Sequence, residues 1–224
     1  MSRVLALVEG YTERAFVSEV LAPELGRLGI DLRARIVGKV GHKGGVRRFE
    51  SVRKDLCALL RQEPRSFVTT MFDYYGLPSD WPGLAGAKGK PPLMAARCVE
   101  EAMARDICAA MGDPFEKARF IPYVQMHEFE ALLFSAPAAL ANAVQCPSLK
   151  PQFEAVVTEC GEPEGIDDRP EKCPSKRIEA LARHYQKTVH GPIAAQRVGL
   201  ARMRAACPHF AAWLGRLEGL GAPR

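Results

Sequence analysis

Short apolar runs alternate with longer segments of helical periodicity over the first 135 residues. Residues 4–8 form an unbroken apolar run, residues 31–38 alternate, and residues 66–73 are rich in β-branched and aromatic side chains. These patterns are typical of strands, and a continuous apolar run is typical of a parallel strand buried on both faces. Residues 119–126 predict a fourth strand, in which Pro122 indicates an edge or bulged position.

Between these strands, apolar residues recur at helical spacing over residues 12–29, 49–60 and 93–112. Thr12 is the expected N-cap of the first of these helices, and Pro23 is expected to kink or restart it. Beyond residue 135 no strand pattern follows. Helices are expected there over residues 138–144, 152–160, 177–186, 194–206 and 209–217.

The pattern predicts an α/β fold with a mainly parallel four-stranded sheet flanked by helices. We expect this sheet domain over residues 1–135 and an all-helical C-terminal region over residues 136–224 that packs on it. Alternation of strand and helix favours parallel pairing, because each crossover carries a helix.

Composition limits the location and the chemistry. The chain has 224 residues and a net charge of +5, with no stretch long and apolar enough for a membrane span. The N-terminus lacks the basic region and cleavage site of a signal peptide, so we expect a cytoplasmic protein without membrane contact. Seven scattered cysteines without a CxxC spacing indicate core thiols rather than a zinc or redox site.

Two predicted strands end in a carboxylate. Glu9 follows the first strand, Asp73 ends the third, and Glu13 lies in the first turn of the helix after Gly10. The carboxyl ends of parallel strands meet at one sheet edge, where such a like-charge cluster usually persists because a metal neutralises it. The alternative is a helix-dipole carboxylate beside a solvated strand end.

The fourth strand also ends beside acidic residues. His127, Glu128 and Glu130 follow it directly. Positions two apart on a helix face different ways, so the two glutamates converge only if Glu128 belongs to the turn. We expect Glu130 inside the site and Glu128 as a second ligand or an orienting group. His127 is more typical of a structural histidine, because magnesium prefers oxygen ligands.

Basic residues suggest an anionic partner. The candidates within a glycine-rich loop and the following helix start are Lys39, Lys43, Arg47 and Arg48, and later ones are Lys176 and Arg177. Such clusters suit a nucleic-acid backbone, although a solvated helix face explains them equally well.

Residues 74–92 are predicted to be irregular. Tyr74 and Tyr75 would suit a loop that stacks bases, whereas Trp81 is more typical of a residue that pins the loop to the body. Asp167 and Asp168 lack the calcium-loop pattern and are expected to be solvated.

Three acidic motifs together carry a family resemblance: Glu9-Gly-x-Thr-Glu13, Phe72-Asp73-Tyr-Tyr-Gly-Leu-Pro78 and His127-Glu-Phe-Glu-Ala-Leu-Leu-Phe134. With them the chain resembles the family catalogued as domain of unknown function 4276, which in turn resembles the Toprim superfamily. The resemblance implies a Toprim-like, Rossmann-like sheet that holds Mg²⁺ or Mn²⁺ through a strand-end glutamate and an Asp-x-Asp motif. Glu9 matches that glutamate and Asp73 the first aspartate, whereas Tyr75 replaces the second.

The nuclease domain of overcoming-lysogenization-defect proteins offers further matches. By this resemblance the catalytic residues are Glu9, Glu13, Asp73, Glu130 and Lys187, and the metal ligands are Glu9, Glu13, Asp73, Glu128 and Glu130. The resemblance implies metal-dependent hydrolysis of nucleic acid in phage defence. A separately encoded ATPase would be its partner, because this chain has no Walker motif.

A second hypothesis belongs to another functional class. A non-catalytic Toprim-like module would bind nucleic acid or an ATPase and keep one metal or none, and Tyr75 in place of an aspartate supports it. A topoisomerase or primase fits less well, since the chain has no room for a zinc module or a separate cleavage domain.

Overall fold

The fold is a parallel sheet with helices on both faces and a helical region below it. It is seen in a computed structural model, which describes residues 1–38, 45, 48–166, 169 and 171–221. The strands are β1 (Ser2–Val8), β2 (Ile30–Ile36), β3 (Phe67–Asp73), β4 (Phe120–Ile121) and β5 (Val124–Gln125). Their order is β2-β1-β3-β4, with β5 also pairing β3, and every pairing is parallel.

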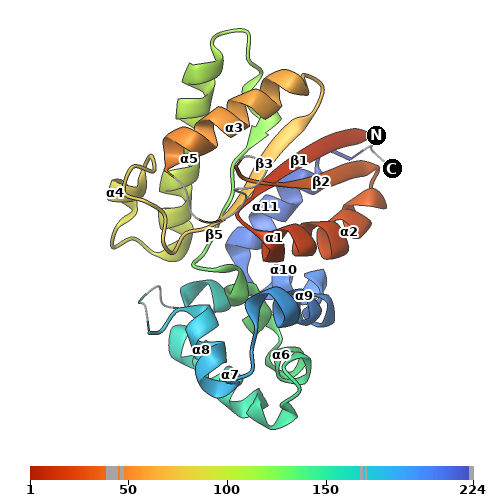
Figure 1. Ribbon diagram of the computed structural model, residues 1–224, viewed down its shortest axis with the longest axis vertical. Coiled ribbons are helices and arrows are strands. Elements are labelled where there is room, and N and C mark those ends of the chain that lie inside the picture. The colour runs from red at the N-terminus through yellow and green to blue at the C-terminus, as the bar shows by residue number, and fades with distance from the viewer. Residues whose placement is uncertain (39–44, 46–47, 167–168, 170, 222–224) are drawn as a thin grey trace.

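Alternation along β1 divides the core into two layers. Leu5 and Leu7 face α3 (Phe49–Gln62) and α5 (Pro92–Met111), while Val4, Ala6 and Val8 face the opposite layer. That second layer contains α1 (Tyr11–Phe16), α2 (Ala22–Gly26) and α11 (Pro208–Glu218), as Figure 1 shows. The sheet is therefore buried on both faces, as its apolar strands predict.

The first helix differs from its prediction. Helical backbone runs from Tyr11 to Gly26, but its middle is the π-helical turn η1 (Val17–Leu21). Its N-cap is Gly10 and no side chain caps it, so the prediction of Thr12 as N-cap is wrong; Thr12 lies buried inside α1. Pro23 is the second residue of α2 and stands just after the π-helical turn, where the helix returns to α geometry.

Pro122 divides the predicted fourth strand in two. Residues 120–121 pair with β3 as β4, and residues 124–125 pair with it again as β5. β4 is the edge strand, as the proline indicated. The backbone N–H of Tyr123 finds its partner in the Thr70 side chain, 2.8 Å away.

The remaining helices are mostly short. They are α4 (Leu84–Ala87), α6 (Pro137–Ala143), α7 (Lys150–Cys160), α8 (Pro174–Leu181), α9 (Lys187–Val198) and α10 (Leu200–Ala206), with the 3-10 turns η2 (Lys117–Arg119), η3 (Phe129–Ser135), η4 (Pro147–Leu149) and η5 (Pro163–Gly165). The helix predicted over residues 194–206 is two helices, because Gly199 adopts a φ of 76° between them. Within the described residues, no helix is long and apolar enough to span a membrane.

The C-terminal region packs directly on the sheet. The Trp213 indole of α11 donates to the Thr69 hydroxyl of β3 at 2.8 Å and stacks on Tyr123 with ring centroids 4.2 Å apart. Ser2 donates to the carbonyl of Leu220 at 2.6 Å. These contacts place helices from the end of the chain beside strands from its start (Figure 1).

Trp81 is buried in the core. Its ring packs edge-on against Phe49 and Phe72, with centroids 5.4 and 5.3 Å away. The interpretation that Trp81 pins the loop of residues 74–92 to the body is therefore confirmed.

Candidate functional site

Glu9 and Asp73 meet at the carboxyl edge of the sheet. β1 and β3 are parallel neighbours, and Val8 is paired with Met71, so the two strands end within two residues of each other. The backbone N–H of Asp73 lies 3.3 Å from Glu9 Oε2 and donates to it. The register thus brings together the two acids that the strand ends predicted.

Glu13 joins them from the first turn of α1. Its Oε2 lies 3.1 Å from the point that a Cβ on Gly10 would occupy, so a side chain at position 10 would crowd this carboxylate. Gly10 itself has an extended backbone with a φ of −148°, which any residue can adopt. The glycine is needed here for space and not for an unusual turn.

Glu130 and Lys187 complete the cluster. Lys187, the first residue of α9, places its Nζ 3.0 Å from Glu130 Oε2 and 3.3 Å from Asp73 Oδ2. The other oxygens have neutral donors, because Asp73 Oδ1 accepts from the N–H of Phe129 at 2.8 Å and Glu130 Oε1 from the Tyr185 hydroxyl at 3.1 Å. Each carboxylate therefore has one oxygen held by the fold and one facing a cation.

The Oε2 atom of Glu130 is distinct among these oxygens. Glu130 is fully buried, and its Oε2 accepts no directed hydrogen bond although the Lys187 ammonium lies within ion-pair distance. A buried carboxylate oxygen without a hydrogen bond is costly in a structural network. The charge of this oxygen is instead compensated by the Lys187 ammonium, 3.0 Å away, so a cation already stands beside it.

Burial dominates the electrostatics of the cluster. Burial, followed by the charge of Glu13, raises the pKa of Glu9 to about 7. Burial likewise raises the pKa values of Asp73 and Glu130, in each case against the lowering influence of Lys187. Burial alone would lower the pKa of Lys187, but Asp73 and Glu130 outweigh it and raise that pKa, so the lysine is a cation.

The spacing of the acids does not by itself form a metal centre. Across the described part of the chain, no three His, Cys, Asp or Glu side chains are arranged so that they could hold a metal ion. The position between the two outward carboxylate oxygens is instead filled by the Lys187 ammonium. The cluster has the donor atoms that magnesium prefers, with an internal cation among them.

Glu128 does not join the Lys187 ion pairs. It precedes η3 with an extended backbone, as expected for a turn residue, but its Oε2 accepts from the N–H of Ser175 at 2.8 Å. Its Oε1 lies 3.1 Å from the Ser175 hydroxyl. Both oxygens therefore accept from Ser175 at the start of α8, and Glu128 as a second ligand or an orienting group stays a prediction.

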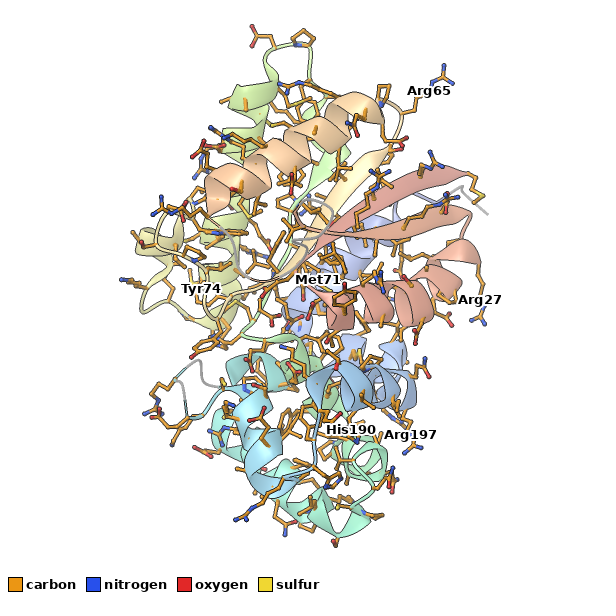
Figure 2. The ribbon with its side chains drawn as sticks, viewed as in Figure 1. Arg27, Arg65, Met71, Tyr74, His190 and Arg197 are labelled. Carbon is orange, nitrogen blue, oxygen red and sulfur yellow. The ribbon has the colours of Figure 1, made fainter. Side chains whose placement is uncertain are left out.

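The aromatic residues after β3 lie beside the cluster. The Tyr74 and His127 rings meet edge to face with centroids 5.8 Å apart, and the N–H of Tyr75 donates to the carbonyl of His127 at 2.8 Å. Figure 2 places Tyr74 at the boundary between the sheet and the helical region below it. Position 75 thus continues the pairing between the two acidic segments without adding a carboxylate.

Of the predicted basic residues, the structure describes Arg48, Lys176 and Arg177. Lys39, Lys43 and Arg47 lie outside the described residues, as do Asp167 and Asp168, and Arg48 is exposed before α3. Lys176 pairs with Glu179 at 2.6 Å. Arg177 binds both oxygens of Glu159.

A cleft of about 620 Å³ opens beside Tyr74 and His127. Lys88, Lys90 and the previously considered Arg177 are among the side chains that line it, and Glu159 is its acidic member. Lys88 and Lys90 are not predicted by any local pattern, because the loop that carries them meets α7 and α8 only in the fold.

Sequence reasoning also missed two groups that hold the acids in place. Tyr185 orients Glu130, and Ser175 binds Glu128 from 47 residues away. The only available signal was that Tyr185 stands two residues before Lys187. Residues 185–187 approach the cluster together as α9 begins.

Comparison with known proteins identifies a family. The family model described as "Domain of unknown function (DUF4276)" matches residues 8–218, which span all of the residues in the cluster. No curated protein and no solved structure matches the chain. The chain is a member of the DUF4276 family.

Proposed function

We propose that this protein is a metal-dependent nuclease that hydrolyses phosphodiester bonds in nucleic acid with Mg²⁺ or Mn²⁺. The observation that supports it is the gathering of Glu9, Glu13, Asp73 and Glu130 around one cation, the Lys187 ammonium, which lies 3.0 Å from Glu130 Oε2 and 3.3 Å from Asp73 Oδ2. Oxygen donors of this kind suit a hard divalent cation. The resemblance to Toprim-like nucleases is the reason for proposing hydrolysis of nucleic acid in particular.

Glu9, Glu13, Asp73 and Glu130 are the residues that would hold the metal. When bound, such an ion polarises a phosphoryl oxygen and lowers the pKa of water. The contacts of Phe129 and Tyr185 fix the two carboxylates so that one oxygen of each faces the same point. This orientation is fixed before any ligand arrives, which is what electrostatic catalysis requires.

Lys187 is the group that would offset negative charge developing on the phosphate. Its side chain is 36% exposed and reaches from the first residue of α9 to the buried acids. A cation in this position can contact a phosphate oxygen at the mouth of the site.

The cleft beside Tyr74 is where the nucleic acid would lie. Lys88 and Lys90 are exposed at its rim, and Tyr74 offers a ring for a base to stack on. A cytoplasmic location and a separately encoded ATPase partner in phage defence are parts of the same proposal. The seven free cysteines are in keeping with a reducing compartment.

The test is a cleavage assay with the full chain on supercoiled plasmid, single-stranded DNA and RNA. We expect cleavage with Mn²⁺ or Mg²⁺, none with EDTA, and loss of activity in Asp73→Asn and Glu130→Gln. The matched control is Glu154→Gln, which changes an exposed acid of α7. Each reaction is run with and without the partner ATPase.

Equal activity in wild type and Asp73→Asn would mean that the cleavage comes from a contaminant. Silence on every substrate with the ATPase present would favour the second candidate, a non-catalytic module that binds nucleic acid or the ATPase. The observation in favour of that candidate is the Lys187 ammonium in the cation position, together with Tyr75 in place of an aspartate.

A further inference from the structure

Lys187 stands where a metal ligated by the cluster would have to stand. Its Nζ contacts Oε2 of Glu130 and Oδ2 of Asp73, whereas the other oxygen of each of these two carboxylates accepts from a neutral donor. The ammonium is therefore bound in the manner of a cation ligand.

An ion and this ammonium compete for the point between those two oxygens. Magnesium binds carboxylate oxygens at about 2.0–2.1 Å, closer than the 3.0 and 3.3 Å of the lysine contacts. An ion touching both oxygens would occupy the space that the ammonium fills, and like charges at such a distance repel strongly in a buried site. Metal entry therefore requires the lysine to leave.

The helix α9 is closely packed, so we assign the departure to the side chain. Gly191 lies one turn along α9, and a Cβ there would stand 3.1 Å from Thr12 Cγ2 and 3.6 Å from the Tyr185 hydroxyl. This close approach locks α9 against α1. The Lys187 side chain, in contrast, has partial exposure and several rotatable bonds that lead outward.

We propose that Lys187 is a tethered counterion that a divalent metal displaces, so that metal binding releases its ammonium toward the mouth of the site. This inference rests on the proposed metal site and adds its regulation. Without metal, the lysine neutralises the buried acids and is withheld from substrate. With metal, the same lysine becomes available to a phosphate, so the site assembles only when it is loaded.

The first test is a Mn²⁺ titration of the full chain. The concentration of free Mn²⁺ is measured from its electron paramagnetic resonance signal. Lys187→Met keeps the length and apolar stem of the side chain and removes its charge. We expect its Mn²⁺ dissociation constant to fall at least about tenfold. The matched control is Lys150→Met, which removes a lysine paired with Glu154 on α7 and should bind Mn²⁺ as wild type does.

The second test uses wild type alone, in case Lys187→Met folds poorly. Reductive methylation followed by peptide mass spectrometry measures how fast each lysine reacts. We expect Lys187 to react several-fold faster with saturating Mg²⁺ than with EDTA, while the rate at Lys150 stays constant. An unchanged or slower rate at Lys187 overturns the exchange.

The two proposals fail in different ways. Equal or weaker Mn²⁺ binding in Lys187→Met, with measurable binding in wild type, refutes the exchange and leaves the metal site intact. Absence of Mn²⁺ binding in both proteins removes the metal site and the exchange together. Tight binding in Lys187→Met without cleavage by wild type supports the exchange and refutes the nuclease.

Discussion

Replacing Glu9 with glutamine should stabilise the protein at alkaline pH. Glu9 has an ordinary pKa of 4.5, which burial and Glu13 raise to about 7 in the fold. At pH 8 the folded protein therefore holds a carboxylate that would be more stable in water. Glutamine keeps an acceptor for the Asp73 N–H but carries no charge.

The magnitude follows from the pKa shift. Each unit corresponds to about 1.4 kcal/mol, so ionised Glu9 opposes folding by about 3 kcal/mol. Because the folded-state pKa is the higher one, the folded protein binds the proton more tightly. Stability is greatest below pH 4.5 for this group and is lost as pH rises from 4.5 through about 7. Glu9→Gln should remove that loss.

The assay is urea unfolding at pH 5, 6, 7 and 8 in EDTA, with wild type, Glu9→Gln and the control Glu24→Gln. Glu24 is an exposed acid of α2. The free energy of unfolding of Glu9→Gln should exceed that of wild type by about 3 kcal/mol at pH 8 and by little at pH 5. Glu24→Gln should follow the wild-type curve.

Added Mg²⁺ gives the same experiment a functional readout. It should raise the stability of wild type at pH 8 and do less for Glu9→Gln, because ligands that bind the native state stabilise it. If the free energies of unfolding of wild type and Glu9→Gln change with pH in parallel, Glu9 does not have a raised pKa in the folded protein. A gain in stability when a charged site residue is removed is expected for a residue that serves activity at the expense of stability.

Three further substitutions test the supports of the site. Glu164→Ala removes the carboxylate that accepts two backbone N–H groups at the start of α11, at 2.8 and 2.9 Å, and should lower the free energy of urea unfolding by about 2–4 kcal/mol. Glu128→Ala removes both oxygens that accept from Ser175 and should cost about 1–3 kcal/mol in the same assay. Burial lowers the pKa of His209, but its bond to Glu100 outweighs burial and raises that pKa. The pair therefore stabilises the folded protein fully below pH 6.5, and this stabilisation is lost as pH rises through the raised pKa. His209→Gln should therefore lose more stability at pH 6 than at pH 8, and an equal loss at both would contradict the pairing.

The sheet was predictable because its strands carry local signals. The unbroken apolar run of residues 4–8 and the β-branched run that ends at Asp73 matched β1 and β3 within one or two residues. The break at Pro122 was foreseen as an irregularity, but its form was not. A lost backbone partner can be replaced in several ways, and here Thr70 replaces it from the neighbouring strand.

The site was predictable only as far as the strand ends reached. Glu9 and Asp73 follow from topology, since parallel neighbours deliver their last residues to one edge. Glu130 is expected there from its position after the fourth strand, whereas Lys187 enters through the resemblance alone, because contacts across 57 or more residues leave no periodic trace. The different fates of Glu128 and Glu130 depend on Ser175 and Tyr185, whose positions are set by helix packing and not by local sequence.

The hydrogen bond between Trp213 and Thr69 has a consequence for how the chain folds. Its partners are 144 residues apart, and α11 covers a sheet face that includes Tyr123. During synthesis this aromatic face stays uncovered until α11 has left the ribosome, so the sheet cannot complete its core early. Contacts of such long range slow folding and leave apolar surface open to aggregation. Truncated chains that end before α11 should therefore bind chaperones or precipitate. The docking of that helix should limit the rate at which the full chain refolds.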